Sequence, residues 1–103
     1  MEKFCSAGDW TIKPGQDEQA FIRAWRDSLD VDPPIHGLFS RARLLRDVDR
    51  PGHLLSIVEW ESREAITEFG SRPSFPEETA PLYEYADVTL LMLEQVAEKV
   101  AEG

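Results

Sequence analysis

The residues best suited to chemistry lie around Trp60. Side chains alternate along a β-strand, so Trp60 shares a face with Ser56, and with Leu54 and Val58. One face could therefore combine an aromatic wall with a hydroxyl group, which suits the lining of a pocket. Plain core packing of Trp60 is the alternative, because an indole needs only one partner for its N–H.

Two residues are candidates for a catalytic role on this strand. His53 opens the strand next to Gly52 and is a candidate proton acceptor, because imidazole titrates near neutral pH. A histidine at the edge of a hairpin is the alternative interpretation. Ser56 is the second candidate, through its hydroxyl group.

Two further side chains are candidates for lining a substrate pocket together with Trp60 and Ser56. The strand face that carries Arg43 is expected to carry Phe39, Arg41 and Leu45 as well. If two copies of the chain pair, Arg43 could hold a phenolate or carboxylate between them. The alternative is that it forms ion pairs with acidic side chains from the second half of the chain. Tyr83 flanks the last helix and could close a pocket, with simple packing at a barrel end as the alternative.

Charge and composition exclude several classes of function. The net charge is −9, and most of the acidic excess lies in residues 51–103. Such a field repels phosphates and anionic lipids, so neither nucleic acid nor a membrane is an expected partner. The sequence has no long apolar run or basic leader, which predicts a cytoplasmic protein. The lone Cys5 has no second cysteine or nearby histidine, and the acidic pairs Glu59/Glu61 and Glu77/Glu78 have neither nearby. The sequence therefore predicts no metal site and no cofactor.

The first half of the chain predicts three strands and one helix. A strand covers residues 3–12, with a break or bulge near Gly8. Apolar positions recur at helical spacing across residues 16–29. Residues 38–46 and 53–60 then read as two strands of a hairpin, because a polar loop with turn residues joins them.

The second half predicts a helix in two pieces and a final strand. Ser62 is a plausible N-cap for a helix that stops at Gly70, and a capping box at Ser74 begins a second piece that Pro81 keeps short, to about residue 82. A strand over 86–94 and a polar, helix-prone tail over 95–103 follow. The order β-α-β-β-α-β predicts one ferredoxin-like α+β domain, residues 1–103, with an antiparallel sheet.

The strand pattern also predicts a homodimer. Helices cover one face of a four-stranded sheet, yet the third and last strands are apolar on both faces, as in the alternation of Leu90 with Leu91. A second copy of the sheet is the simplest cover, and a folded-back tail is the alternative. We expect a pocket between the two paired sheets, with room for a small aromatic ligand.

Several segments resemble the antibiotic biosynthesis monooxygenase (ABM) family over nearly the whole chain. They are residues 10–16 (WTIKPGQ), 21–25 (FIRAW), 44–47 (LLRD), 51–53 (PGH) and 56–66 (SIVEWESREAI). The resemblance implies a dimeric α+β barrel. It also implies one of several activities: cofactor-independent oxygenation of quinols or other electron-rich aromatics, haem degradation, or no catalysis.

Residue identities narrow these implied activities. Trp60 matches the tryptophan of the family, but the chain has no asparagine, and both histidines, His36 and His53, precede Trp60. The haem-degrading triad therefore cannot be assembled, and Ser56 stands where the aromatic-polyketide oxygenases carry asparagine. The leading hypothesis is a cofactor-independent monooxygenase acting on a small aromatic or quinol-type substrate. The alternatives are a non-catalytic dimeric binding module, or a cofactor-free isomerase or cyclase.

Overall fold

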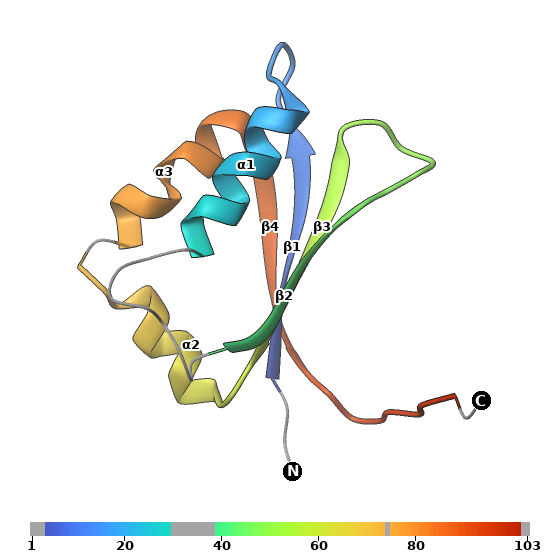
Figure 1. Cartoon of the computed structure of the whole chain (residues 1–103), viewed down its shortest axis with the longest axis vertical. Coiled ribbons are helices and arrows are strands. Elements are labelled where there is room, and N and C mark those ends of the chain that lie inside the picture. Colours follow the sequence, from blue (N-terminus) through green and yellow to red (C-terminus); the bar gives the residue numbers. More distant parts are fainter. Residues whose placement is uncertain (1–3, 30–38, 74, 102–103) are drawn as a thin grey trace.

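The chain forms one antiparallel sheet with helices on one side. The computed structural model describes residues 4–29, 39–73 and 75–101 (Figure 1). Its elements are β1 (Phe4–Ile12), α1 (Glu18–Leu29), β2 (Phe39–Arg46), β3 (His53–Trp60), α2 (Arg63–Gly70), α3 (Phe75–Tyr85) and β4 (Ala86–Glu94). The strand order β2-β3-β1-β4 places β1 and β3 at the centre. The predicted ferredoxin-like α+β fold is confirmed, and so is the second helix in two pieces.

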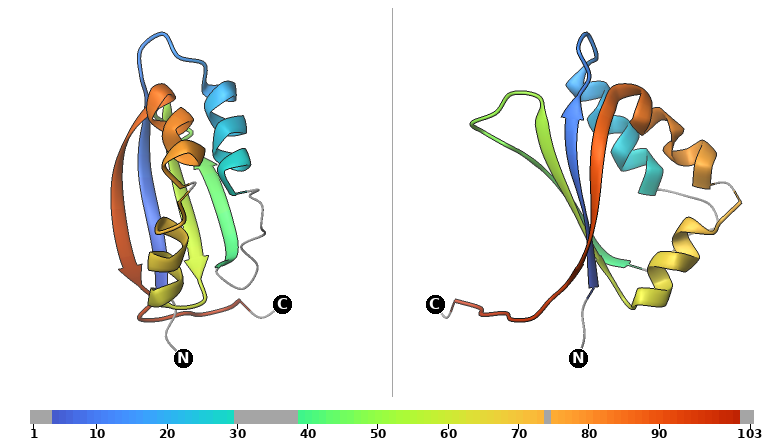
Figure 2. Two further views of the ribbon diagram at one scale, coloured as in Figure 1. Left: turned by 90° about the vertical axis from the view of Figure 1, so that its left-hand side faces the viewer. Right: turned by 180° about the vertical axis from the view of Figure 1, so that it is seen from behind.

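The two faces of the sheet have different environments. Helices α1, α2 and α3 lie together against one face, which we call the helix face, and the other side is the open face (Figure 2). Residues 95–101 leave the body on the side away from the helices and form neither helix nor strand (Figure 1). The predicted helical tendency of this tail is not realised, because so short a helix is marginal without a surface to pack on.

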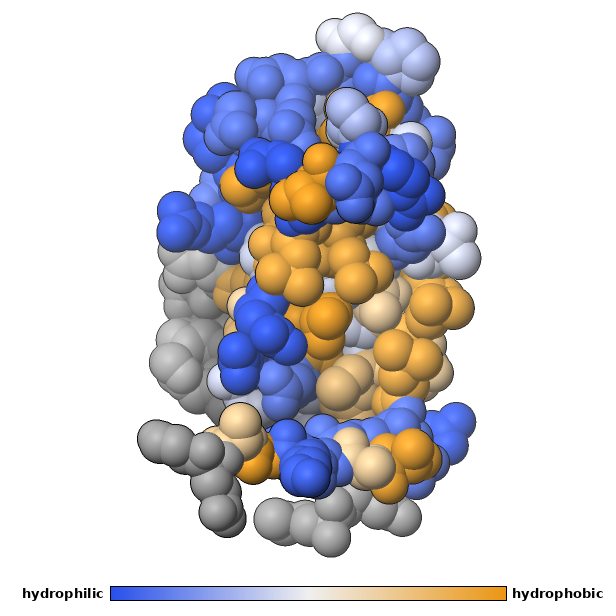
Figure 3. All heavy atoms as spheres, turned by 90° about the vertical axis from the view of Figure 1, so that its right-hand side faces the viewer, coloured by the Kyte–Doolittle hydropathy of each residue, from blue (hydrophilic) through white to orange (hydrophobic). Residues whose placement is uncertain are grey.

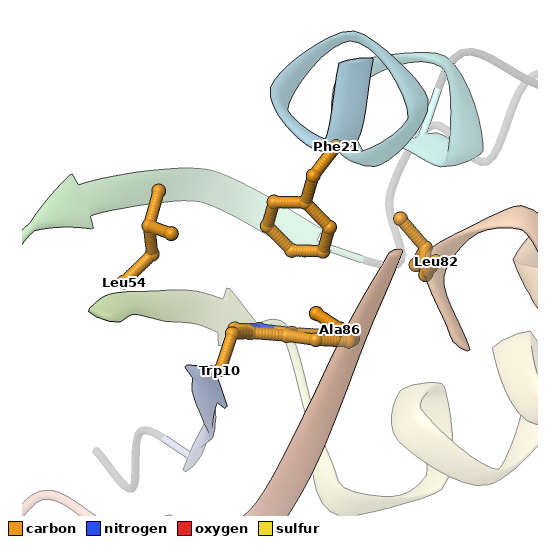
Figure 4. Close-up of a cluster of buried hydrophobic side chains, with 5 residues drawn as sticks. All are labelled: Trp10, Phe21, Leu54, Leu82 and Ala86. Atoms are coloured by element: carbon orange, nitrogen blue, oxygen red, sulfur yellow. The ribbon is translucent and has the colours of Figure 1, made fainter. Parts of the chain in front are cut away.

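Two hydrophobic clusters hold the helices on the sheet. In the first, the fully buried Phe21 of α1 lies over Trp10 of β1, with ring centroids 5.0 Å apart (Figure 4). The other members of this cluster are Leu54, Leu82 and Ala86. The second cluster joins β3 to α2 and consists of Val58, Trp60, Ala65 and Phe69. Each large side chain removed from water contributes about 1.5–3 kcal/mol, so the clusters fix the helix positions.

Helix α3 runs further than the sequence predicted. It passes through Pro81 and ends at Tyr85, so the expectation that Pro81 stops it near residue 82 is wrong. A proline inside a helix removes one backbone hydrogen bond and frees the carbonyl four residues earlier, here that of Glu77. Both residues are exposed, so water can satisfy that carbonyl. The predicted capping serine, Ser74, lies outside the described residues.

A β-bulge in β2 separates residues that the sequence predicted to share one face of the strand. The register of β2 against β3 shifts between Phe39 and Arg41, which makes Ser40 an extra residue. A shift of one residue moves every following side chain to the other face. Phe39 therefore lies on the helix face with Trp60, whereas Arg43 and its alternate neighbours, Arg41 and Leu45, lie on the open face. The expectation that these side chains share one face with Phe39 is wrong for that reason.

The start of α2 depends on a side-chain cap. Ser62 has an extended backbone, and its Oγ accepts a hydrogen bond from the backbone N–H of Ala65 at 3.1 Å. This confirms Ser62 as the N-cap. We expect Ser62→Ala to lower the free energy of unfolding by about 1 kcal/mol, measured by urea denaturation, whereas Ser62→Asp should cost much less because a carboxylate also caps. Equal losses in the two variants would contradict the cap.

Candidate active site

The candidate site lies on the helix face, between the two hydrophobic clusters. The strand register aligns Ser56 of β3 with Gly8 of β1, and places Ser6 one row further along β1, opposite Val58. We call Ser6, Gly8 and Ser56 the serine floor. Leu54 of the first cluster and Trp60 of the second flank it along β3. The floor is thus a small, polar patch between two aromatic groups.

The indole of Trp10 lies over the glycine of the floor. Its Nε1 donates a buried hydrogen bond to Oγ of Ser56 at 2.9 Å. A Cβ placed on Gly8 would come within 2.5 Å of this nitrogen and 2.7 Å of the serine oxygen. A glycine is therefore required at position 8 because the Trp10 indole and the Ser56 hydroxyl leave no room for a Cβ. It does not form a bulge, because β1 pairs continuously with both neighbouring strands. The predicted break near Gly8 is wrong.

A second indole makes the matching contact at the other end. Nε1 of Trp60 donates to Oγ of Ser6 at 2.9 Å. The ring of Trp60 is 6% exposed and packs against Phe69 of α2 at 5.3 Å and Phe39 of β2 at 6.0 Å. The parity argument that put Ser56 and Trp60 on one face is confirmed, but the two residues do not contact each other through a hydrogen bond. Each instead pairs with a residue of β1.

These two contacts form a local repeat that the sequence interpretation missed. Each central strand carries a serine four residues before a tryptophan: Ser6 and Trp10 on β1, Ser56 and Trp60 on β3. Because the strands are antiparallel and Ala7 pairs with residue 57, the register relates the two segments by a local two-fold axis through that pair. The identical spacing was visible in the sequence. However, the pairing of each serine with the tryptophan of the other strand follows only from the register of β1 against β3.

The helix layer leaves one side of the floor open. Across the sheet, Leu90 of β4 neighbours Gly8 and Met92 neighbours Ser6, so both point to the helix side. They are nevertheless 65% and 53% exposed. In Figure 2 (left), β4 lies beside the helices and not behind them. A ligand could approach the half-buried Ser6 from this side.

The structure does not bring all predicted site residues together. Trp60 and Ser56 lie on the helix face, and Tyr83 of α3 lies on the same side, with its ring 6.2 Å from that of Trp10. Arg43 and His53 lie on the open face. One chain therefore cannot present all five to one ligand, because the sheet separates them. The expected pocket between paired sheets would lack Trp60 and Ser56.

His53 and its neighbours line a separate hollow on the open face. This hollow, of about 360 Å³, lies beside the β2–β3 hairpin. Nδ1 of His53 is 3.3 Å from Oγ1 of Thr11. At the rim, the Arg50 guanidinium binds Asp47 at 2.7 Å and keeps the pKa of that carboxyl below its ordinary value. On the same face Arg41 lies 3.9 Å from Glu59, an ion pair with the second half of the chain.

Within residues 4–29, 39–73 and 75–101, no three His, Cys, Asp or Glu side chains gather as metal ligands would. No helix in those ranges is long and apolar enough to cross a bilayer.

The chain matches one protein family in sequence and several solved structures in fold. The family model described as antibiotic biosynthesis monooxygenase matches residues 4–77. SnoaB, a cofactor-independent oxygenase from Streptomyces nogalater, is similar in structure, with a TM-score of 0.81 and 15% identity over 99% of this chain and 100% of that one. A candidate antibiotic biosynthesis monooxygenase from Bordetella bronchiseptica gives 0.75 and 17%, over 98% and 100% of the two chains. At these identities the likeness concerns the fold. No curated protein sequence matches the chain.

The close approach at Gly8 can be tested by one methyl group. We expect Gly8→Ala to lower the free energy of unfolding by about 1–3 kcal/mol in urea denaturation, because the new Cβ must push Trp10 away from Ser56. Gly70→Ala is the matched control. Nothing lies within 4 Å of its added Cβ, and alanine favours a helix, so it should be neutral or stabilising. Equal stability of Gly8→Ala and wild type would contradict the packing.

Proposed function

Because the chain belongs to the antibiotic biosynthesis monooxygenase family, we propose that it is a cofactor-independent monooxygenase of small aromatic or quinol-type substrates. The observation that carries the proposal is the serine floor between two buried indoles, with one side open beside β4. This arrangement combines aromatic walls, hydroxyl groups and restricted access for water. Trp60, Ser56 and Tyr83 are the proposed pocket residues, and Ser6 and Trp10 join them.

The proposed reaction draws all its electrons from the substrate. An ionised hydroquinone, naphthol or anthrone gives one electron to O₂, and the two radicals then combine into a peroxide on a ring carbon. Protonation gives a hydroperoxide. Loss of water from it converts that carbon to a carbonyl group, so one oxygen atom enters the product and the other leaves as water. The protein supplies orientation, dryness and stabilisation of the anion.

The floor residues suit this supporting role. Trp10 and Trp60 are large, flat and buried, so they can hold an aromatic ring in place. The buried hydroxyl of Ser56 is a neutral hydrogen-bonding group in an apolar setting, where such bonds are stronger than in water. His53 and Arg43 have no part in the proposed site within one chain, since they lie on the open face.

The second candidate is a non-catalytic binding module with the same fold. One observation favours it: in the described chain, Ser56 and Trp60 share the helix face of the sheet with titratable side chains only at its corners, Arg46 and Glu94. The same observation speaks against an isomerase or cyclase, which would need a group to move a proton.

We also propose that the chain is a homodimer paired through the open face. Leu45, Leu55, Leu91 and Leu93 lie on this face, and each is between 39% and 48% exposed. Figure 3 shows hydrophobic residues across the middle of this face and out to its right-hand edge, with hydrophilic residues mainly above and below them. So large an apolar patch is unusual on a monomer, and a second copy of the same sheet would cover it.

The enzymatic proposal predicts oxygen uptake that depends on Trp60. Purified protein with chelator and no added cofactor should consume O₂ with at least one of a panel of hydroquinones, naphthols and anthrones. Trp60→Phe keeps an aromatic ring but removes the donor to Ser6, so we expect kcat/KM to fall roughly 10- to 100-fold through loss of orientation.

Trp25→Phe is the matched control for that experiment. Trp25 lies on α1, where it lines a groove beside β2 and makes no indole hydrogen bond within the described chain, so uptake should stay within about twofold of wild type. Uptake absent across the panel, with ligand binding retained, would instead support the binding module. Equal losses in both variants would place the site elsewhere.

The dimer predicts opposite results for two neighbouring leucines. Leu91→Lys places a charge on the open face, and we expect light scattering to show a fall from about twice 11.7 kDa to the monomer mass. Leu90→Lys places the same charge on the helix face and should stay dimeric. A monomeric wild type at micromolar concentration, or dissociation of both variants, would contradict pairing through this face.

A further inference from the structure

We infer that this site accepts aromatic substrates as the oxyanion, and that they must be acidic enough to ionise in water before they bind. The inference rests on the proposed function and adds the chemical class of substrate to it: phenols, naphthols and enolised ketones that are already partly ionised near neutral pH. It follows from what the serine floor can donate and what the surrounding residues cannot accept.

The two serines of the floor have hydroxyl protons to offer. A serine hydroxyl has one donor and two acceptor positions. In Ser6 and Ser56 the oxygen accepts from an indole N–H, which leaves the O–H free to donate. Within the described residues neither hydroxyl donates to a protein acceptor. Ser56 is 6% exposed, so its hydroxyl lies in a largely dry environment, where an anionic oxygen is the strongest acceptor.

The sheet supplies no proton acceptor beside these serines. Side chains on the described helix face of the sheet are apolar or hydroxyl-bearing, except at two corners. Arg46 stands at one corner and is paired with Glu18 of α1 at 3.2 Å. Glu94 stands at the other, at the exposed end of β4. His53 is on the opposite face.

In the described helices, Glu18 and Glu78 are the carboxylates that are not exposed, and both are paired, with Arg46 and Arg72. Both carboxylate oxygens of Glu78 accept from Arg72, whose guanidinium lies 5.1 Å from the ring centre of Phe69. Tyr83 and Tyr85 also lie beside the first cluster, and their phenols donate readily but are poor proton acceptors. The described site can therefore stabilise an anion but cannot make one. A substrate that stays protonated in water would bind without reacting.

Binding of 4-nitrophenol tests the inference without any oxygen chemistry, because its anion absorbs in the visible range. We expect the bound ligand to be the anion, with a pKa about one unit below that of the free ligand, since hydrogen bonds to the charged form favour it. Ser6→Ala should return this pKa towards the free value and weaken binding several-fold. Ser71 is exposed and lies at the C-terminal end of α2, opposite the N-cap Ser62. Ser71→Ala is therefore the matched control and should change neither the pKa of the bound ligand nor its affinity.

Ser6→Ala and the stronger variant Ser56→Ala each leave an indole N–H without its acceptor, that of Trp60 and that of Trp10. Ser6→Cys and Ser56→Cys therefore accompany them, and thermal unfolding identifies any loss of folding. Preferential binding of neutral nitrophenol, or an anion preference that survives removal of either hydroxyl, would overturn the inference. Anion binding without oxygen uptake by any substrate would uphold it and overturn the monooxygenase instead.

The pH dependence of oxygen uptake gives a second readout. For substrates of graded acidity, the midpoint of kcat/KM should move with the pKa of each substrate. A midpoint that stays near pH 6–7 for all of them would reveal a base on the protein and overturn the inference. His36 lies outside the described residues, so His36→Gln is included, and its profile should match that of wild type.

Discussion

A buried indole must find an acceptor for its N–H, and this requirement governs the centre of the molecule. Leaving such a donor unpaired costs about 1–3 kcal/mol, a large share of the stability of a small domain. The register of β1 against β3 meets the requirement twice, because it sets each tryptophan diagonally across from a serine. The absence of a side chain at Gly8 makes the first contact possible. Register, glycine and hydroxyls therefore constrain one another, and none can change alone.

The sheet also divides the chemistry of the chain between its two faces. The helix face has aromatic rings and hydroxyls, whereas the open face has His53 and Arg43 beside exposed leucines, with the Asp47–Arg50 pair at the rim of its hollow. The extra residue at Ser40 contributes to this division, because it puts Phe39 beside Trp60 while Arg41 and Arg43 lie on the open face. Neutral groups thus surround the candidate site, and apart from Arg46 and Glu94 at its corners, the charged side chains of the sheet lie on the surface proposed for pairing.

Much of this architecture could be predicted from the sequence. Periodicity, caps and turn residues located the elements to within one or two residues for most of the chain, and strand parity placed Ser56 with Trp60. Parity failed in β2 because a bulge has no strong signature: Ser40 is an ordinary strand residue. Gly8 was misread because a glycine within a strand can mark either a bulge or a close approach, and only the position of Trp10 decides between them. The partners of the serines required the register of distant segments.

The local two-fold axis between β1 and β3 bears on regiochemistry. The two serine–tryptophan pairs alone cannot distinguish the two ends of an elongated aromatic ring system, because the axis exchanges one pair with the other. Discrimination must come from the groups that break the symmetry. Trp10 meets Phe21 of α1 and Tyr83 of α3, whereas Trp60 meets Phe69 of α2 and Phe39 of β2. The carbon that receives oxygen would then be selected by these neighbours, and by Gly8, whose counterpart across the axis is Val58.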